Sequence, residues 1–214
     1  MIVSLSILNI EKSNRFEKIN EFMSVKDNWI HFDVMDGMFV ENKTFTYEVV
    51  KEIGEYCDFF KDVHLMTYNP DSMLKEYKEA GTDQITFHYE SAEKDMIVPI
   101  IEKIKSLGMK AGISIKPMTN VEEIKEYLPL LDLVLIMSVE PGKGGQKFME
   151  EILYKIETLR DIRDENGYHY VINVDGGINA DTVKLVKEAG ADMVVSGSYV
   201  CKSENYNERI ESLR

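Results

Sequence analysis

Eight short apolar runs alternate with longer amphipathic stretches along this 214-residue chain. The runs have the length and β-branched character of buried strands. They cover residues 2–8, 29–35, 60–66, 84–88, 110–115, 131–137, 170–174 and 193–196. The amphipathic stretches between them include residues 71–80, 96–107, 120–127, 148–164 and 181–189. Such an alternation predicts an α/β fold in which helices cover a parallel sheet. Eight units favour a closed (β/α)8 TIM barrel, with residues 1–214 forming a single domain.

An open, doubly wound sheet is the alternative arrangement of the same elements. That fold would place a glycine-rich nucleotide fingerprint directly after the first strand. The segment SLSILNIEKSN contains no glycine, which favours the closed barrel.

The composition limits the partners of this chain. A net charge of -13 disfavours binding to nucleic acids and to anionic membrane surfaces. No apolar run is long enough to span a bilayer, and the opening MIVSLSILNIEK has the pattern of a strand and not of a signal peptide. Cys57 and Cys201 form neither a CxxC motif nor a disulfide framework. We therefore expect a cytoplasmic protein without nucleic-acid or membrane partners.

Polar side chains lie unexpectedly on one face of the second strand. The segment IHFDVMDGMFVEN, residues 30–42, places His31, Asp33 and Met35 at alternating positions, so all three point the same way. Burying an unpaired charge is costly. These groups therefore form either a satisfied polar cluster or a binding site.

Further ionisable side chains stand at the ends of other strands, where barrels carry their chemistry. Three histidines and two aspartates at matching heights favour a site over isolated core histidines. The mixed nitrogen and oxygen set suits one divalent ion such as Zn, Mn, Fe or Co. Its members are His31, Asp33, His64 and Asp175. His88 and Glu90 would support these ligands or contact a substrate, whereas His169 precedes its strand and is expected on the surface.

Three glycine-rich segments follow the last strands. MSVEPGKGGQKF, residues 137–148, is a long loop with the freedom to cover a ligand. VDGGIN, residues 174–179, and SGSYV, residues 196–200, follow the seventh and eighth strands, where barrels commonly bind phosphate through backbone amides. Each segment is equally compatible with an ordinary tight turn, but two adjacent glycine turns favour a phosphate site.

These motifs resemble those of the ribulose-phosphate 3-epimerase family. HFDVMDGMFVEN, HLM at 64–66, FHYES at 87–91, MSVEPGKGGQKF, VDGGIN and GS at 197–198 occur in the family's order along nearly the whole chain. The resemblance implies a barrel with one divalent ion held by His31, Asp33, His64 and Asp175. It also implies that Asp33 and Asp175 act as the acid/base pair that epimerises D-ribulose 5-phosphate and D-xylulose 5-phosphate at C3, through a metal-stabilised enediolate.

The resemblance also implies substrate contacts and an assembly. Relatives form dimers and hexamers, so a homo-oligomer is expected. The implied contacts with the ketose phosphate are Ser6, Met35, His64, Met66, Met137, Gly142, Gly144, Gly145, Asp175, Gly177, Gly197 and Ser198.

Three positions depart from the family pattern and leave the substrate open. Glu41, Lys116 and Lys143 stand where proline, asparagine and an aromatic residue are usual. The closely related D-allulose-6-phosphate 3-epimerases share the same site residues, so they remain an alternative. Lys116 ends the fifth strand, where a desolvated lysine would permit a Schiff-base aldolase. A non-catalytic sugar-phosphate-binding barrel is the third alternative.

Overall fold

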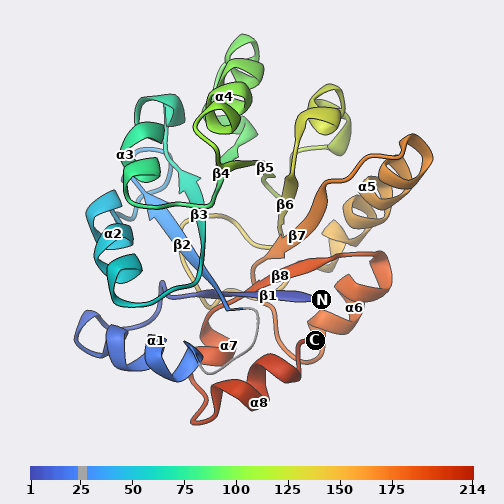
Figure 1. Cartoon of the computed structure of the whole chain (residues 1–214). Coiled ribbons are helices and arrows are strands. Elements are labelled where there is room, and N and C mark those ends of the chain that lie inside the picture. The colour runs from blue at the N-terminus through green and yellow to red at the C-terminus, as the bar shows by residue number, and fades with distance from the viewer. Residues whose placement is uncertain (24–27) are drawn as a thin grey trace.

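Eight parallel strands close into one barrel in chain order (Figure 1). The computed structural model describes residues 1–23 and 28–214. The strands are β1 (Ile2–Ser6), β2 (Trp29–Met35), β3 (Phe60–Met66), β4 (Gln84–His88), β5 (Lys110–Ile115), β6 (Leu133–Met137), β7 (Val171–Asp175) and β8 (Met193–Ser196). Because β8 pairs with β1, the sheet has no free edge. The predicted (β/α)8 fold is confirmed.

Helices follow the strands and surround the barrel (Figure 1). The α-helices are α1 (Arg15–Met23), α2 (Tyr47–Tyr56), α3 (Leu74–Glu79), α4 (Lys94–Ser106), α5 (Leu153–Asn166), α6 (Thr182–Ala189), α7 (Ser198–Cys201) and α8 (Tyr206–Glu211). The 3-10 segments are η1 (Lys12–Asn14), η2 (Pro70–Ser72), η3 (Tyr89–Ser91), η4 (Val121–Leu130) and η5 (Glu150–Ile152). Within residues 1–23 and 28–214, none of these helices has the length and apolarity needed to cross a bilayer.

The predicted helix at 120–127 differs in type from the structure. This segment is the 3-10 helix η4, which begins after Asn120 with a reciprocal capping box to Glu123. Pro129 lies inside the segment and cannot donate a helical hydrogen bond, because proline has no N–H. The amphipathic pattern predicted a helical segment here but not its tighter winding.

Alternation along β2 separates the core from the site. Ile30, Phe32 and Val34 are buried in the main apolar core, and each such burial contributes about 1.5–3 kcal/mol. His31 and Asp33 point to the opposite face of the strand, into the barrel. The parallel register places Asp33 beside His64 on β3. The apolar packing of β2 therefore determines which polar groups meet inside.

Candidate metal centre and active site

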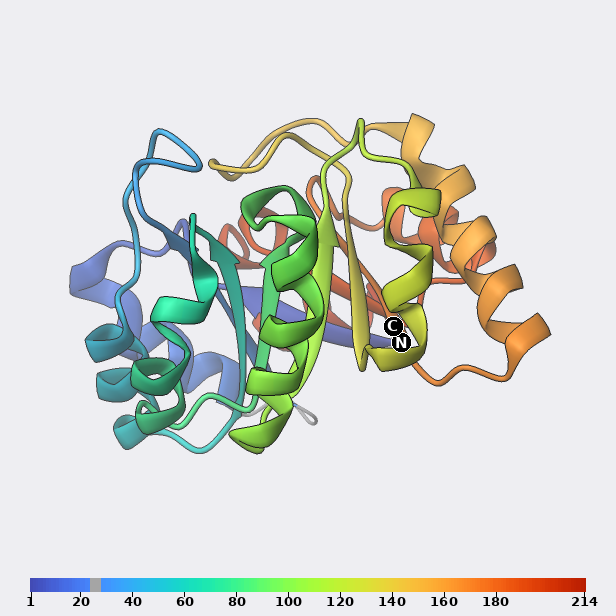
Figure 2. The ribbon, with the colours of Figure 1, turned by 90° about the horizontal axis from the view of Figure 1, so that it is seen from above.

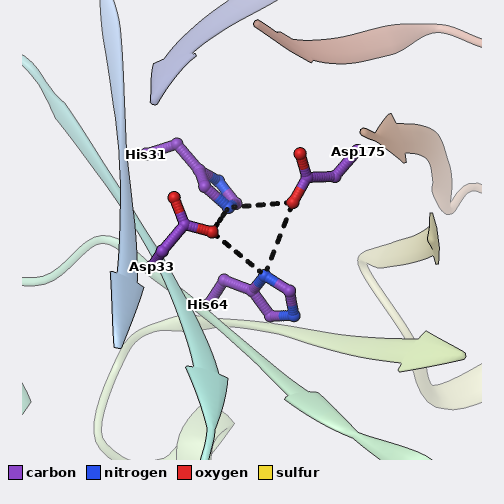
Figure 3. Close-up of side chains that lie close together, drawn as sticks. All are labelled: His31, Asp33, His64 and Asp175. Carbon is purple, nitrogen blue, oxygen red and sulfur yellow. Dashed lines mark ion pairs between the residues drawn. The ribbon is translucent and has the colours of Figure 1, made fainter. Parts of the chain in front are cut away.

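Two imidazoles and two carboxylates converge at the carboxyl ends of β2, β3 and β7 (Figure 3). His31 Nε2 lies 3.6 Å from Asp33 Oδ1 and 3.8 Å from Asp175 Oδ2. His64 Nδ1 lies 3.8 Å from each of the same two oxygens. All four donor atoms lie within 4.8 Å of one another. The structure thus brings together the four residues expected to ligate a metal.

The donor atoms fit a divalent cation. His31 Nε2 and His64 Nδ1 are buried and have no hydrogen-bond partner, a condition that costs about 1–3 kcal/mol for a polar atom. Donors that share one tetrahedral ion at bond lengths of about 2.0–2.2 Å lie about 3.4 Å apart. Four of the six donor pairs lie 3.6–3.8 Å apart, close to that value. A shared ion would therefore satisfy both orphaned nitrogens.

The two carboxylates have opposite electrostatic environments in the metal-free protein. Burial alone would raise the pKa of Asp33, but the His31 and His64 imidazoles together lower it below the ordinary value. Burial and the nearby Asp33 charge raise the pKa of Asp175 to about 7. The two carboxylates therefore differ in their affinity for a proton, a difference that suits a base and an acid.

His31 is oriented by a buried carboxylate that was not among the expected site residues. Its Nδ1 lies 2.7 Å from Asp62 Oδ2, and Asp62 also accepts hydrogen bonds from Ser4 Oγ and Gln84 Nε2. Asp62 accepts from Nδ1–H and so directs Nε2 at the cluster, where its lone pair becomes available once the ring is neutral, as a metal ligand must be. The sequence signal was FKDVHLM, where Asp62 and His64 alternate on one face of β3.

His64 has a different neighbour. Its Nε2 lies 3.0 Å from Nε2 of His88, whose Nδ1 lies 3.1 Å from Glu90 Oε2. Burial lowers the pKa of His64 to about 4, so this imidazole is neutral and has a lone pair to offer. Of the two roles expected for His88 and Glu90, the geometry matches support of a ligand.

A cavity at the mouth of the barrel contains nearly all the expected substrate contacts. His64 is the exception, because it is fully buried and does not line the cavity. The side chains of Met35, Met66 and Met137 are at most 5% exposed and give the cavity apolar walls. The expected residues that line it are Ser6, Met35, Met66, Met137, Gly142, Gly144, Gly145, Asp175, Gly177, Gly197 and Ser198.

The glycine-rich loop at 142–145 lies over this mouth and meets the loop that follows β2 (Figure 2). Asn42 Nδ2 donates a 2.7 Å hydrogen bond to the Gly142 carbonyl. A Cβ on Gly142 would lie 3.1 Å from Val40 Cβ, and one on Gly144 would lie 2.3 Å from Asn9 Nδ2. Glycine therefore permits the close approach of this loop to the loops that follow β1 and β2.

Gly177 allows a stability prediction with a matched control. Its φ is +64°, and an added Cβ would lie 2.6 Å from the backbone nitrogen of Phe148. Gly167 has a φ of +65° but open space around it. Both alanine variants share the left-handed strain of about 1–2 kcal/mol, and only Gly177→Ala adds a backbone collision. We expect Gly177→Ala to lower the free energy of unfolding by about 1 kcal/mol or more beyond Gly167→Ala. Urea denaturation measures the difference, and equal losses would contradict it.

The three departures from the family pattern lie around the mouth. Glu41 and Lys143 are exposed, and Lys143 lines the cavity. Lys116 Nζ lies 4.2 Å from the centroid of the Phe39 ring, and Lys116 is not among the residues that line the cavity. This placement gives no support to a Schiff base at Lys116. His169 is exposed, as expected.

Sequence comparisons with known proteins agree on one family. The model of the family described as "Ribulose-phosphate 3 epimerase family" matches residues 2–201. A Mycobacterium bovis protein named ribulose-phosphate 3-epimerase is 41% identical over 187 residues, which cover 87% of this chain and 81% of the relative. A Synechocystis protein of the same name is 39% identical over 214 residues, which cover 100% of this chain and 93% of the relative. A crystal structure of 3-hexulose-6-phosphate synthase superposes with a TM-score of 0.75 at 16% identity, covering 100% of this chain and 98% of that one. At this low identity the last similarity shows the shared fold alone.

Proposed function

We propose that this chain, an isomerase that belongs to the ribulose-phosphate 3-epimerase family, interconverts D-ribulose 5-phosphate and D-xylulose 5-phosphate by inverting C3. The observation that supports this most directly is the convergence of Asp33 and Asp175, from the non-adjacent strands β2 and β7, on one buried cluster. Inversion requires a proton to leave one face of C3 and another to arrive at the opposite face. Two carboxylates from different walls of a barrel meet that requirement, whereas simple binding does not need them.

Asp33 and Asp175 carry the proton transfers in this proposal. The C2 carbonyl makes the C3 proton acidic, and an ionised Asp33 removes it. Asp175, which reaches the cluster from β7 on another wall of the barrel, then donates a proton to the other face. Ser6 Oγ donates a 2.7 Å hydrogen bond to Asp33 Oδ2, which holds the carboxylate while Oδ1 faces the cluster. The two roles exchange in the reverse reaction.

We further propose that His31, Asp33, His64 and Asp175 hold one divalent ion of the Zn, Mn, Fe or Co class. When bound, the ion supplies Lewis-acid stabilisation of the negative charge that develops as the C3 proton leaves. The chain contributes a dry surrounding, because Met35, Met66 and Met137 present thioether and methylene surface to the cavity. Exclusion of water strengthens the electrostatic interactions inside the site.

The phosphate is proposed to bind at the turns after β7 and β8. Gly177, Gly197 and Ser198 line the cavity there, and their backbone N–H groups suit an anion without a lysine. This arrangement is compatible with the net charge of -13. The loop at 142–145 is proposed to cover the bound sugar.

We also propose a homo-oligomer, either a dimer or a hexamer, that works in the cytoplasm without nucleic-acid or membrane partners. The family resemblance supports the oligomer. Cys57 and Cys201 are free thiols and suit a reducing compartment.

A kinetic comparison of two substrates tests the proposed function. Metal-reconstituted protein is assayed with D-ribulose 5-phosphate and with D-allulose 6-phosphate, which is one carbon longer. We expect kcat/KM to favour ribulose 5-phosphate by about 10- to 200-fold, the discrimination typical of one extra carbon in a fitted pocket. A preference for allulose 6-phosphate would assign the alternative substrate, and turnover of neither sugar would contradict epimerase activity.

A further inference from the structure

A line of hydrogen bonds runs from His64 away from the cluster. Figure 3 shows one ring nitrogen of His64 facing the two carboxylates and the other pointing away from them. That second nitrogen, Nε2, lies 3.0 Å from His88 Nε2. His88 Nδ1 lies 3.1 Å from Glu90 Oε2. Both imidazoles are fully buried, so water does not compete for these contacts.

Glu90 is held at the far end of this line by the loop at 116–119. Its Oε1 accepts hydrogen bonds from the Lys116 backbone N–H, at 2.8 Å, and from the Thr119 hydroxyl. The loop is itself tethered by the fully buried Lys155 of α5. Lys155 Nζ donates to the carbonyls of Lys116, Pro117 and Thr119 at 3.0, 2.6 and 2.6 Å. Glu90 thus binds the loop with Oε1, and its Oε2 remains available to His88.

These contacts select one tautomer for both histidines. Burial alone would raise the pKa of Glu90, but its hydrogen bonds with His88, Thr119 and Lys116 lower it to about 2. An ionised carboxylate only accepts, so His88 Nδ1 carries the proton and His88 Nε2 has the lone pair. His64 Nε2–H must then be the donor to His88. The lone pair of His64 consequently lies on Nδ1 and points at Asp33 and Asp175.

We propose that His88 and Glu90 are positioning residues that hold His64 in its Nε2–H tautomer and so prepare Nδ1 to ligate a divalent ion. Asp62 orients His31 by direct contact. For His64 the corresponding carboxylate is that of Glu90, which acts through the imidazole of His88. The ligation rests on the proposed function, but the tautomer is a property of the chain alone. Tautomer and metal affinity can therefore be measured separately.

Glu90→Gln tests this inference. The amide oxygen of glutamine can replace Oε1 at the loop, which leaves its NH2 group facing His88. That group donates, so it would place the proton of His88 on Nε2 and reverse both tautomers. In metal-free protein with 15N-labelled histidine, we expect NMR to show His64 changing from Nε2–H to Nδ1–H. Chelator competition with Zn²⁺ and Mn²⁺ should show affinity falling by about 10- to 100-fold.

Glu93→Gln is the matched control, because Glu93 is exposed and nearby and its replacement removes the same charge. We expect this variant to keep the wild-type tautomer and affinity. Wild-type affinity of Glu90→Gln, or weaker binding without a tautomer change, would overturn the inference. Failure of the wild-type chain to bind either ion would instead contradict the proposed metal centre, while the NMR spectra would still decide the tautomer.

Thr119 provides a second pair of variants if Glu90→Gln does not fold. Thr119→Val removes one donor to Glu90, whereas Thr119→Ser keeps the hydroxyl. We expect Thr119→Val to bind Zn²⁺ more weakly than the wild-type chain does, and Thr119→Ser to keep the wild-type affinity. Equal affinities for these two variants would overturn the role of the carboxylate anchor.

Discussion

Asp175→Asn is expected to lower kcat/KM for epimerisation by about 100- to 10,000-fold, the range typical of a lost acid/base group. Asn retains an oxygen that can face the cluster, and it is close to Asp in size, so the barrel should stay folded. An amide cannot hold or deliver a proton at this position. The expected loss therefore reports on proton transfer at C3 more than on assembly of the site.

Isotope exchange separates the two carboxylates in this variant. Asp33 remains in Asp175→Asn, so one epimer should still exchange its C3 proton with D2O although inversion is lost. Mass spectrometry of each recovered epimer measures the uptake. Asp95→Asn is the control, because Asp95 is exposed on α4, and it should retain wild-type turnover. Near-wild-type epimerisation by Asp175→Asn would rule out the two-base scheme, and the absence of exchange in the wild-type chain would favour a binding protein over an enzyme.

Removal of divalent ions by a chelator is the second change with a large expected effect. We expect epimerisation to fall by at least about 100-fold, equivalent to about 3 kcal/mol of lost transition-state stabilisation. Zn²⁺, Mn²⁺, Fe²⁺ or Co²⁺ should restore it. His31→Ala should reproduce the loss without recovery at the same ion concentrations, because it removes one of the two orphaned nitrogens.

His169→Ala is the control for the histidine variant, since His169 is exposed and belongs to no described cluster. It should behave as wild type before and after chelation. Full activity of a chelated protein, with metal content verified by elemental analysis, would contradict the proposed centre.

Much of the fold was predictable because strand and helix periodicities differ. The alternation of apolar runs with amphipathic stretches predicted eight parallel strands. Five of the observed strands, including β2 (Trp29–Met35) and β3 (Phe60–Met66), have the predicted bounds. Period-two alternation also predicted that His31 and Asp33 share a face. Their convergence with Asp175 followed from the rule that parallel strands in a barrel end at one mouth.

The supporting shell of the site was harder to predict, because it depends on neighbours that are distant in sequence. Asp62 supports His31 only through the β2–β3 register, which the alternation within a single strand does not specify. Lys155 would be expected on a helix surface. Its burial follows from three carbonyls of a loop that lies 36–39 residues earlier in the chain. Such contacts require coordinates.

The β2–β3 register links correct strand pairing to metal binding. His31 pairs with Asp62, and Asp33 pairs with His64, so a slip of one residue in either strand would turn its polar side chains outward. Three of the four proposed metal ligands come from these two strands, so a barrel with this pair misaligned would not bind the ion. The fraction of a preparation that takes up an equivalent of metal should thus measure the fraction of molecules with correctly aligned strands.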